Sequence, residues 1–225
     1  MEYNAVNAKI KAMSARLLTL PEYRILCQSQ SIEHFMAQVK SRDSIEEELR
    51  RVRLFLTNIK DRRLLSLEED FIFAWSYIKS LPSGQNRQAL IQIKGTEIDL
   101  NNILRIYRLK LYYPDAEIYS KLIPIFYRLS KDEIKQMAES PGIGEFIVTV
   151  RHTRYGYIAF DHVEAKIDHA MMRVFSRMTK RYPQSVAGVI GYFFAKKIEI
   201  HNLTAVMEGV KYHIPPEEIL NHLRL

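Results

Sequence analysis

Cysteine, glycine, proline and long apolar runs are all scarce in this chain. Its 225 residues include one cysteine, so a disulfide bond within the chain is excluded, and such usage is typical of a reducing compartment. Glycine and proline number 8 each, which disfavours an all-β fold with many turns. The longest apolar run, 186–195, has about half of the roughly 20 residues that a membrane-spanning helix needs. With 47% hydrophobic residues, we expect a soluble cytosolic protein with a core of its own.

Signals for secretion, nucleotide binding and metal binding are also missing. The first residues, 1–4, lack the basic start and apolar block of a signal peptide. Neither the phosphate-binding loop Gly-x-x-x-x-Gly-Lys-Ser/Thr nor the turn Gly-x-Gly-x-x-Gly is present, so we expect no nucleotide and no cofactor. His162 and His169 lack the three- or four-residue spacing of a helical metal site. Cys27, between apolar and polar helix neighbours, is expected to be a packing residue rather than a nucleophile.

The chain is rich in signals for the start and the end of helices. A Ser or Thr followed three residues later by Glu forms a capping box, in which hydroxyl and carboxylate bind backbone amides at a helix start. Such boxes begin at Thr19, Ser44, Ser66 and Ser130. Together with the apolar spacing and the breaks at prolines, they predict an all-α fold. The expected helices are 4–18, 21–28, 31–39, 45–59, 67–80, 86–111, 115–122, 131–138, 143–151, 158–181, 184–209 and 216–223.

Two local sequences occur twice, each at a constant separation. In the first echo the segment 19–35 corresponds to 130–146, and in the second echo 98–103 corresponds to 198–203. A repeat of this length indicates a duplicated helical unit, and repeated helical units usually form surfaces rather than catalytic clefts. The expected units, two tandem related helical modules that pack together, are 1–112 and 113–225.

One part of the second copy favours a strand when it is read locally. Residues 146–150 and 155–157 carry the pattern of a β-hairpin. The counterpart in the first copy, 35–39, does not. Because the two copies should share one structure, we expect a helix at 143–151.

Each copy of the second echo contains an acid and, three residues later, an asparagine. Asn102 and Asn202 each lie between aliphatic residues four positions away on either side, and so on an apolar helix face. A buried amide there costs about 1–3 kcal/mol unless it is hydrogen-bonded. Asp99 with Asn102, and Glu199 with Asn202, are therefore candidates for structural polar locks between helices. The alternative is a direct role of the asparagines in binding a partner.

The net charge of +7 is mild and spread along the chain. It is compatible with an acidic protein partner or with anionic headgroups, and it specifies neither. No recognised nucleic-acid-binding motif accompanies the charge, so nucleic acid is not the expected partner. The candidates for contact with a partner are Arg105, Arg108, Lys110, Lys121, Arg50, Arg51 and Arg53.

Four stretches resemble one known family, and they follow the family's order. They are Ala8-Lys9-Ile10-Lys11-Ala12-Met13 with Tyr23-Arg24-Ile25-Leu26, then Glu97-Ile98-Asp99-Leu100-Asn101-Asn102-Ile103-Leu104-Arg105, then Leu129-Ser130-Lys131-Asp132-Glu133-Ile134, and Tyr192-Phe193-Phe194-Ala195-Lys196-Lys197-Ile198-Glu199-Ile200-His201-Asn202-Leu203. The chain resembles one component of rotary V-type ATPases, the C subunit of archaeal and bacterial complexes and the d subunit of eukaryotic ones. Lys197 stands where that family usually has an acid. The family has three related helical units that form a funnel, and this chain resembles a shortened member with two.

The resemblance implies a non-catalytic coupling part of a V-type ATPase or ATP synthase. Its implied partners are the central-shaft subunits and the membrane rotor ring, between which it would pass torque for proton or sodium transport. It would need no cofactor and would sit peripherally on the cytoplasmic face of the membrane, through the ring. The alternatives are a helical-repeat adaptor outside a rotary motor and a basic nucleic-acid-binding protein.

Overall fold

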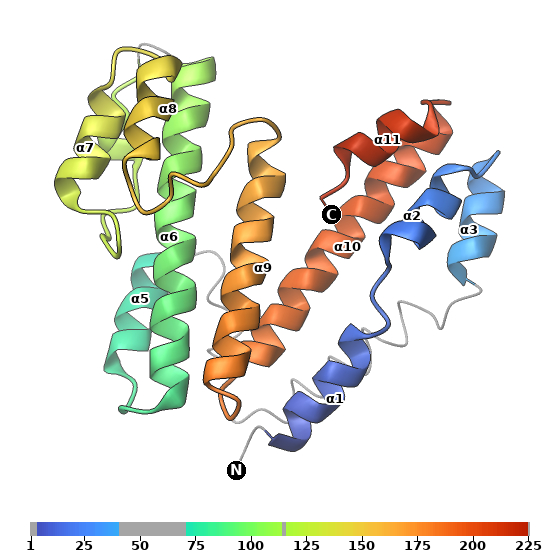
Figure 1. Cartoon of the computed structure of the whole chain (residues 1–225), viewed down its shortest axis with the longest axis horizontal. Helices are drawn as coiled ribbons and strands as arrows, with labels where there is room; N and C mark the ends of the chain where they lie inside the picture. Colours follow the sequence, from blue (N-terminus) through green and yellow to red (C-terminus); the bar gives the residue numbers. More distant parts are fainter. Residues whose placement is uncertain (1–3, 41–70, 114–115, 225) are drawn as a thin grey trace. The chain divides into compact units, whose positions relative to one another are not determined.

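The computed structural model describes residues 4–40, 71–113 and 116–224 (Figure 1). All regular elements in these ranges are helices, which confirms the predicted all-α class. The elements are α1 (Asn4–Ser14), α2 (Leu20–Cys27), α3 (Ile32–Lys40), α5 (Phe71–Ser80), α6 (Gln85–Tyr112), the short 3-10 helix η2 (Tyr119–Lys121), α7 (Lys131–Glu139), α8 (Ile143–Arg151), α9 (Val163–Arg181), α10 (Ala187–Lys211) and α11 (Pro216–His222). None of the helices described is both long and apolar enough to cross a membrane.

Two of the predicted capping boxes begin helices. Glu22 Oε2 accepts the backbone N–H of Thr19 at 2.7 Å before α2, and Glu133 Oε2 accepts that of Ser130 at 2.7 Å before α7. Each box binds backbone groups that a helix start leaves unpaired, so both starts are encoded within a few residues. Outside the described residues lie the predicted boxes at Ser44 and Ser66 and the predicted helix 45–59.

The predicted α-helix at 115–122 is wrong. Of its described residues, only Tyr119–Lys121 are helical, as the single turn η2. The next backbone groups, those of Ile123, are hydrogen-bonded to the Asn102 side chain of α6 instead of continuing a helix. Pro124 reinforces this, because the residue before a proline avoids helical geometry.

Two other helices are shorter than predicted. Helix α1 ends at Ser14 rather than at residue 18, since the chain must become extended at Thr19 to form the capping box of α2. Helix α9 begins at Val163 rather than at residue 158. His162 has a left-handed backbone, with φ 51°, which a right-handed helix cannot include.

The segment with the local strand pattern is the helix α8, as the repeat predicted. Phe146 and Val150 lie one helical turn apart and are buried, whereas Val148 between them is exposed. The buried apolar residues therefore have helical spacing. This confirms the helix that the repeat predicted at 143–151, where the local pattern favoured a strand.

Contacts divide the chain into two compact units. Segments from both predicted halves contribute to each unit, and the predicted division at 112/113 stays a prediction. The duplication itself remains a prediction. The described residues of the first unit are 4–15, 71–113, 116–195 and Arg224, and those of the second are 16–40 and 196–223.

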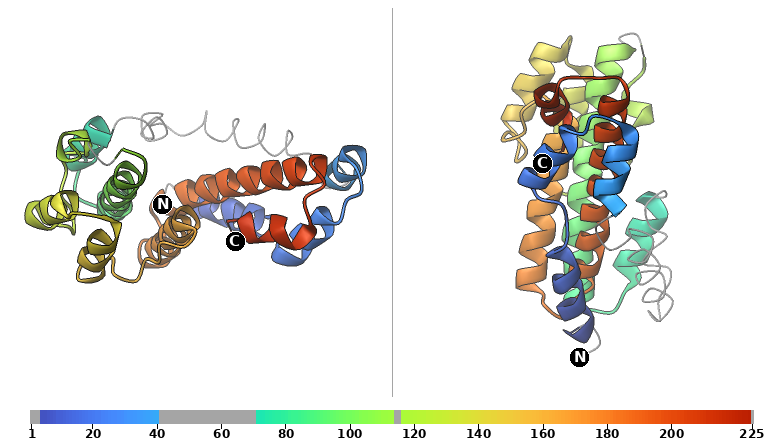
Figure 2. Two further views of the ribbon diagram at one scale, coloured as in Figure 1. Left: turned by 90° about the horizontal axis from the view of Figure 1, so that it is seen from above. Right: turned by 90° about the vertical axis from the view of Figure 1, so that its right-hand side faces the viewer.

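Helix α6 is the central element of the first unit. Helices α5, α7, α8 and α9 all pack on it, as two further views show (Figure 2). Its residues Ile103 and Ile106 are fully buried in one core with Phe146 of α8 and Met171 of α9. Helix α6 is therefore placed to position side chains throughout this unit.

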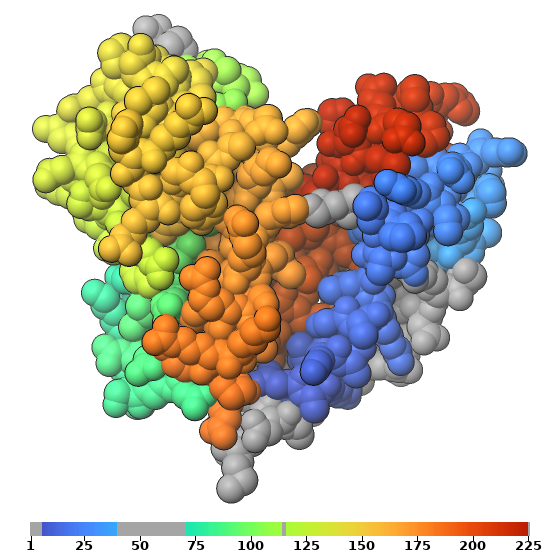
Figure 3. All heavy atoms as spheres, viewed as in Figure 1, coloured from blue at the N-terminus to red at the C-terminus, as the bar shows by residue number. Residues whose placement is uncertain are grey.

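The second unit is built on the part of α10 that follows Ala195. Its core joins Leu203 and Val206 of α10 to Tyr23 and Leu26 of α2 and to Phe35 of α3. Helix α11 packs on α2 and adds apolar residues of its own to the same core. The surfaces of α2, α3 and α11 are continuous in the space-filling view (Figure 3).

Candidate functional site

Asp99 lies in the middle of α6 and is fully buried. Its Oδ2 accepts hydrogen bonds from the backbone N–H groups of Arg128 at 2.9 Å and Leu129 at 3.3 Å, and from the Tyr155 hydroxyl at 2.8 Å. Its Oδ1 accepts the N–H of Tyr127 at 3.4 Å. The carboxylate thus holds the segment that leads into α7 against α6.

The electrostatics of this carboxylate follow from its burial. Burial raises the pKa of Asp99 above its ordinary value, while the hydrogen bonds from the backbone and from Tyr155 act in the opposite direction. Burial is also the largest cause of a raised pKa of Tyr155, and the nearby negative charge of Asp99 is the second. The phenol therefore stays protonated and donates, which suits an anchor of the fold rather than a proton-transfer pair.

One turn further along α6, Asn102 binds the same connecting segment. Its Nδ2 donates to the carbonyl oxygen of Ile123 at 3.0 Å, and its Oδ1 accepts the N–H of Ile123 at 2.9 Å. The side chain is fully buried. Both polar groups of the amide are used, as a lock on an apolar helix face requires.

Gly95 contributes to the same anchor by having no side chain. A Cβ at this position of α6 would lie 2.4 Å from a ring carbon of Tyr127. The Tyr127 ring, whose backbone N–H binds Asp99, therefore rests directly on the helix backbone. Sequence reasoning missed Gly95, although a glycine in the interior of a long helix is a signal for such a close approach.

Glu199 occupies the corresponding place on α10, in the second unit. Its Oε1 accepts the backbone N–H of Leu18 at 2.7 Å, and its Oε2 accepts the Lys196 ammonium at 2.6 Å. Glu199 and Lys196 are both buried, so the two charges form an internal ion pair. This carboxylate holds the residue that immediately precedes the capping box of α2.

Asn202 links α10 to α2 through a side chain. It forms a hydrogen bond with Tyr23, and both residues are buried. Burial raises the pKa of Tyr23, and the hydrogen bond from Asn202 acts against that rise. Asn102 binds backbone and Asn202 binds a side chain, but each joins a long helix to the segment packed on it.

The predicted partner-contact residues on α6 all bind groups of their own fold. Arg105 Nη1 donates to the carbonyl oxygen of Lys121 at 3.2 Å. Arg108 Nη2 forms an ion pair with Glu164 Oε1 at 2.8 Å. Arg105, Arg108 and Lys121 are exposed, so a partner can still reach them. Arg50, Arg51 and Arg53 lie outside the described residues.

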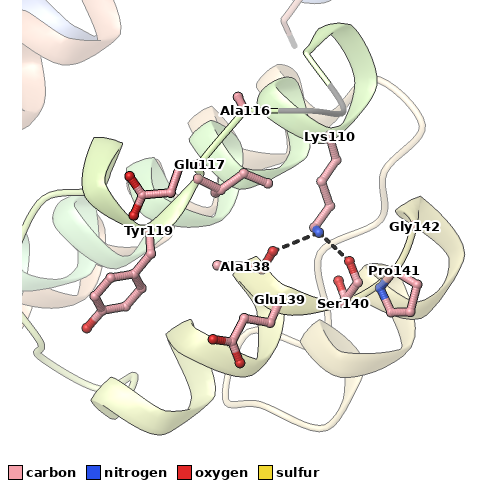
Figure 4. Close-up of a pocket in the computed structure, with 10 residues that line it drawn as sticks. Lys110, Ala116, Glu117, Tyr119, Ala138, Glu139, Ser140, Pro141 and Gly142 are labelled. Carbon is pink, nitrogen blue, oxygen red and sulfur yellow. Dashed lines mark hydrogen bonds between the residues drawn. The ribbon is translucent and has the colours of Figure 1, made fainter.

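Lys110 is more enclosed than Arg105, Arg108 and Lys121. Its ammonium donates to the carbonyl oxygens of Ala138 at 2.9 Å and Ser140 at 2.6 Å, at the end of α7 (Figure 4). Burial lowers the pKa of Lys110. A cation at a helix C-terminus binds carbonyls that have no partner within the helix, so this lysine ties α6 to α7.

A cavity of about 370 Å³ opens beside Lys110. Its walls come from the end of α6, the segment through η2 and the turn between α7 and α8 (Figure 4). Besides Lys110, its ionisable wall residues are Glu117, Tyr119 and Glu139. The Lys110 ammonium could compensate the charges of Glu117 and Glu139, but it already donates to two carbonyl oxygens. The lysine beside the cavity therefore has a structural role in joining α6 to α7.

No group of three or more His, Cys, Asp and Glu side chains within the described ranges is placed to hold a metal ion. His162 is the N-cap residue that precedes α9, and His169 lies within that helix. Cys27 is buried, and its burial, with a smaller effect of Glu217, raises its pKa to about 11. The thiol is therefore protonated at neutral pH, which fits a packing residue better than a nucleophile.

Sequence reasoning missed two partners of the buried acids. Lys196 precedes Glu199 by three residues, so helical geometry would have brought the two together once Glu199 was known to be buried. Tyr155 lies 56 residues from Asp99, and no local pattern relates the two. Only the packing of α6 and the segment after α8 joins them.

Comparison with known proteins gives consistent matches. The family model "ATP synthase (C/AC39) subunit" matches residues 70–222. The C subunit of the A-type ATP synthase of Archaeoglobus fulgidus is 29% identical over 170 residues, which are 69% of this chain and 48% of that protein. Those of Pyrococcus abyssi and Pyrococcus horikoshii are 24% and 28% identical, and each match covers 96% of this chain and 62% of the relative. The chain thus spans about half to three fifths of these relatives.

Proposed function

Because this chain belongs to the ATP synthase (C/AC39) subunit family, we propose that it is a non-catalytic coupling part of a rotary ATPase. In this role it connects the central shaft to the membrane rotor ring and passes torque between them during proton or sodium transport. It sits peripherally on the cytoplasmic face of the membrane, through the ring. The observation that carries the proposal is the match over residues 70–222, together with relatives named as C subunits of A-type ATP synthases that align with 96% of the chain.

The described geometry supports this role because a coupling part must be stiff. Each unit is a set of helices around one long helix, and close-packed interiors of this kind have low compressibility. Buried carboxylates and amides tie the connecting segments to the long helices at Asp99, Asn102, Glu199 and Asn202. Such ties resist sliding of one helix along another, which a merely apolar contact permits more easily.

We propose that contact with partners is made in part by exposed basic side chains. Lys121 and Arg105 in the first unit are exposed, and Arg50, Arg51 and Arg53 supply a further basic stretch of the sequence. Complementary charge speeds association and fixes register more than it adds affinity. Lys110 is the least suited to this task, because its ammonium already binds two carbonyl oxygens.

Affinity purification from native membranes tests the proposed function. The tagged full chain is expected to recover the shaft and ring subunits of an assembled rotary ATPase, identified by mass spectrometry. Recovery of neither, when those subunits are present and assembled, would contradict the proposal. Binding to nucleic acid that weakens steeply with salt would instead favour the nucleic-acid alternative.

A pair of charge reversals sharpens the same experiment. Lys121→Glu is expected to lower the recovery of the shaft and ring proteins, most strongly at low salt. The matched control is Lys135→Glu, an exposed lysine of α7 with a surface ion pair to Glu139 at 3.8 Å. Equal recovery with both variants would remove Lys121 from the contact surface and leave the coupling role to be judged by the purification alone.

A further inference from the structure

Helices α2 and α3 correspond in position to α7 and α8. Helix α3 spans Ile32–Lys40 and α8 spans Ile143–Arg151, so both bounds are shifted by the separation of the first echo. Helix α2 begins at Leu20 and α7 at Lys131, which gives the same shift. The backbone therefore repeats at the interval of the repeated sequence.

The buried positions of the two helix pairs follow the same interval. Each pair therefore turns the corresponding face toward its core, and the match extends from sequence to packing. The corresponding residues are Tyr23, Leu26, Cys27 and Phe35 of α2 and α3 and, in the same order, Ile134, Met137, Ala138 and Phe146 of α7 and α8.

The hydrogen bond at the start of each pair also corresponds. Leu129, the residue before the N-cap of α7, donates its backbone N–H to Asp99 at 3.3 Å. Leu18, the residue before the N-cap of α2, donates its backbone N–H to Glu199 at 2.7 Å. The two donors have the separation of the first echo, and the two acids occupy equal places in the second echo.

Packing decides which long helix each pair belongs to. In the chain each pair precedes a long helix, so a simple tandem repeat would place α2 and α3 on α6. In the structure it is α7 and α8 that pack on α6, the long helix before them. Helices α2 and α3 share one core with α10 and α11, which come much later in the chain (Figure 2).

We infer that the repeated module is a long helix followed by a capping-box pair, and that the second module takes its pair from an earlier segment of the chain. The modules are α6 with α7 and α8, and α10 with α2 and α3. The apolar face of α10 and α11 is the binding site of α2 and α3. Asp99 and Glu199 are the positioning residues, because each fixes the backbone where its pair begins.

The first pair covers the last long helix, so the apolar residues Leu203 and Val206 of α10 are enclosed by the chain itself. The pair that completes the core around this part of α10 is therefore the one that comes earliest in the chain.

Cys27 allows a local test in the full chain, because it is the one cysteine and lies in the core that α2 shares with α10. Val206→Ala is expected to raise the rate of Cys27 labelling by a small maleimide about tenfold, as the loss of about 1.4 kcal/mol of docking free energy would. The matched control is Ile106→Ala on α6, the position that corresponds to Val206 and is equally buried, with an expected change of less than about twofold. Equal acceleration by both variants would overturn the inference.

A segment replacement tests the correspondence of the two pairs. Residues 19–40 are replaced by the sequence of 130–151, which has the same length, and unfolding in urea is followed by circular dichroism. We expect one cooperative transition. A control carries the sequence of 128–149 in place of 19–40, so that its buried positions are shifted by two residues. This control is expected to lose the cooperative transition. The inference fails if both replacements fold or if both do not.

Discussion

Two buried acids on two long helices perform the same task with different partners. Asp99 on α6 accepts hydrogen bonds from three backbone N–H groups and from the hydroxyl of Tyr155. Glu199 on α10 accepts one backbone N–H and pairs with the ammonium of Lys196. Each carboxylate holds the chain immediately before a capping box.

The difference between the two sites begins three residues before each acid. Thr96 stands on α6 where Lys196 stands on α10, at the separation of the second echo. Without a lysine at that position, Asp99 is stabilised by several dipoles, and its burial raises its pKa. With the lysine, one charge compensates the other. The repeat thus preserves the location of an anchor, whereas the surroundings decide how its charge is accommodated.

The largest effect is expected from Asp99→Ala. The substitution leaves buried N–H groups and the Tyr155 hydroxyl without an acceptor, so we expect a loss of about 3–4 kcal/mol in the free energy of unfolding. Urea unfolding followed by circular dichroism measures it. A loss below about 1 kcal/mol would mean that the donors find other acceptors.

Lys196→Met is expected to cost about 3 kcal/mol, because it leaves Glu199 buried without its cation. The double variant Lys196→Met with Glu199→Gln should lose less than the single one, since no uncompensated charge remains. A double-mutant cycle in urea provides the comparison. Strict additivity of the two substitutions would show that the ion pair does not couple them.

Asn102→Ala should destabilise by about 2–3 kcal/mol and Asn202→Ala by about 1–2 kcal/mol, as measured by urea unfolding. The order follows from what each amide binds. Loss of the Asn102 amide leaves the buried backbone N–H of Ile123 without an acceptor, and the carbonyl oxygen of Ile123 keeps only the N–H of Ile125. Loss of the Asn202 amide leaves a tyrosine hydroxyl, which can rotate. Equal losses within error would contradict this order and would favour equivalent locks in the two modules.

The raised pKa of Asp99 predicts a pH dependence that Asp99→Asn lacks. Because the pKa is higher in the folded state, the folded protein binds more protons than the unfolded chain between the ordinary and the raised value. Stability from this group is full below the ordinary pKa and is lost as the pH rises through the raised one, with a slope of at most about 1.4 kcal/mol per pH unit. The unfolding free energy of the wild type minus that of Asp99→Asn should therefore fall with pH across this window. A difference that rises with pH would reverse the sign of the shift.

The smallest effect is expected from Lys135→Ala. Its ion pair with Glu139 is exposed on α7, with a separation of 3.8 Å, and such pairs contribute about 0.3–0.5 kcal/mol. Thermal unfolding at low and at high salt is a sufficient measurement. A loss of unfolding free energy as large as that expected for Lys196→Met would mean that burial does not explain the difference between the two ion pairs.

Local features were predictable to the extent that a few neighbouring residues decide them. The capping boxes at Thr19 and Ser130 start helices because their partners are three residues away. The helix at 143–151 needed the repeat, since its own apolar pattern favoured a strand. The helix predicted at 115–122 was wrong, because the chain there is bound by Asn102 of α6. For the candidate site, the sequence identified Asp99, Asn102, Glu199 and Asn202 as candidate locks, but not what each of them binds.

The sequence by itself determined the helical class, the starts of α2 and α7, the two acid–asparagine pairs and the resemblance to a component of rotary ATPases. All of these depend on residues within a few turns of one another or on patterns along the chain. The tertiary structure decided that α2 and α3 share a core with α10 and α11, and that Asp99 and Glu199 are stabilised differently. The donors involved lie far away in the chain, 181 residues in the case of Leu18 and Glu199, and only the packing of the helices in a shared core brings them within hydrogen-bonding distance.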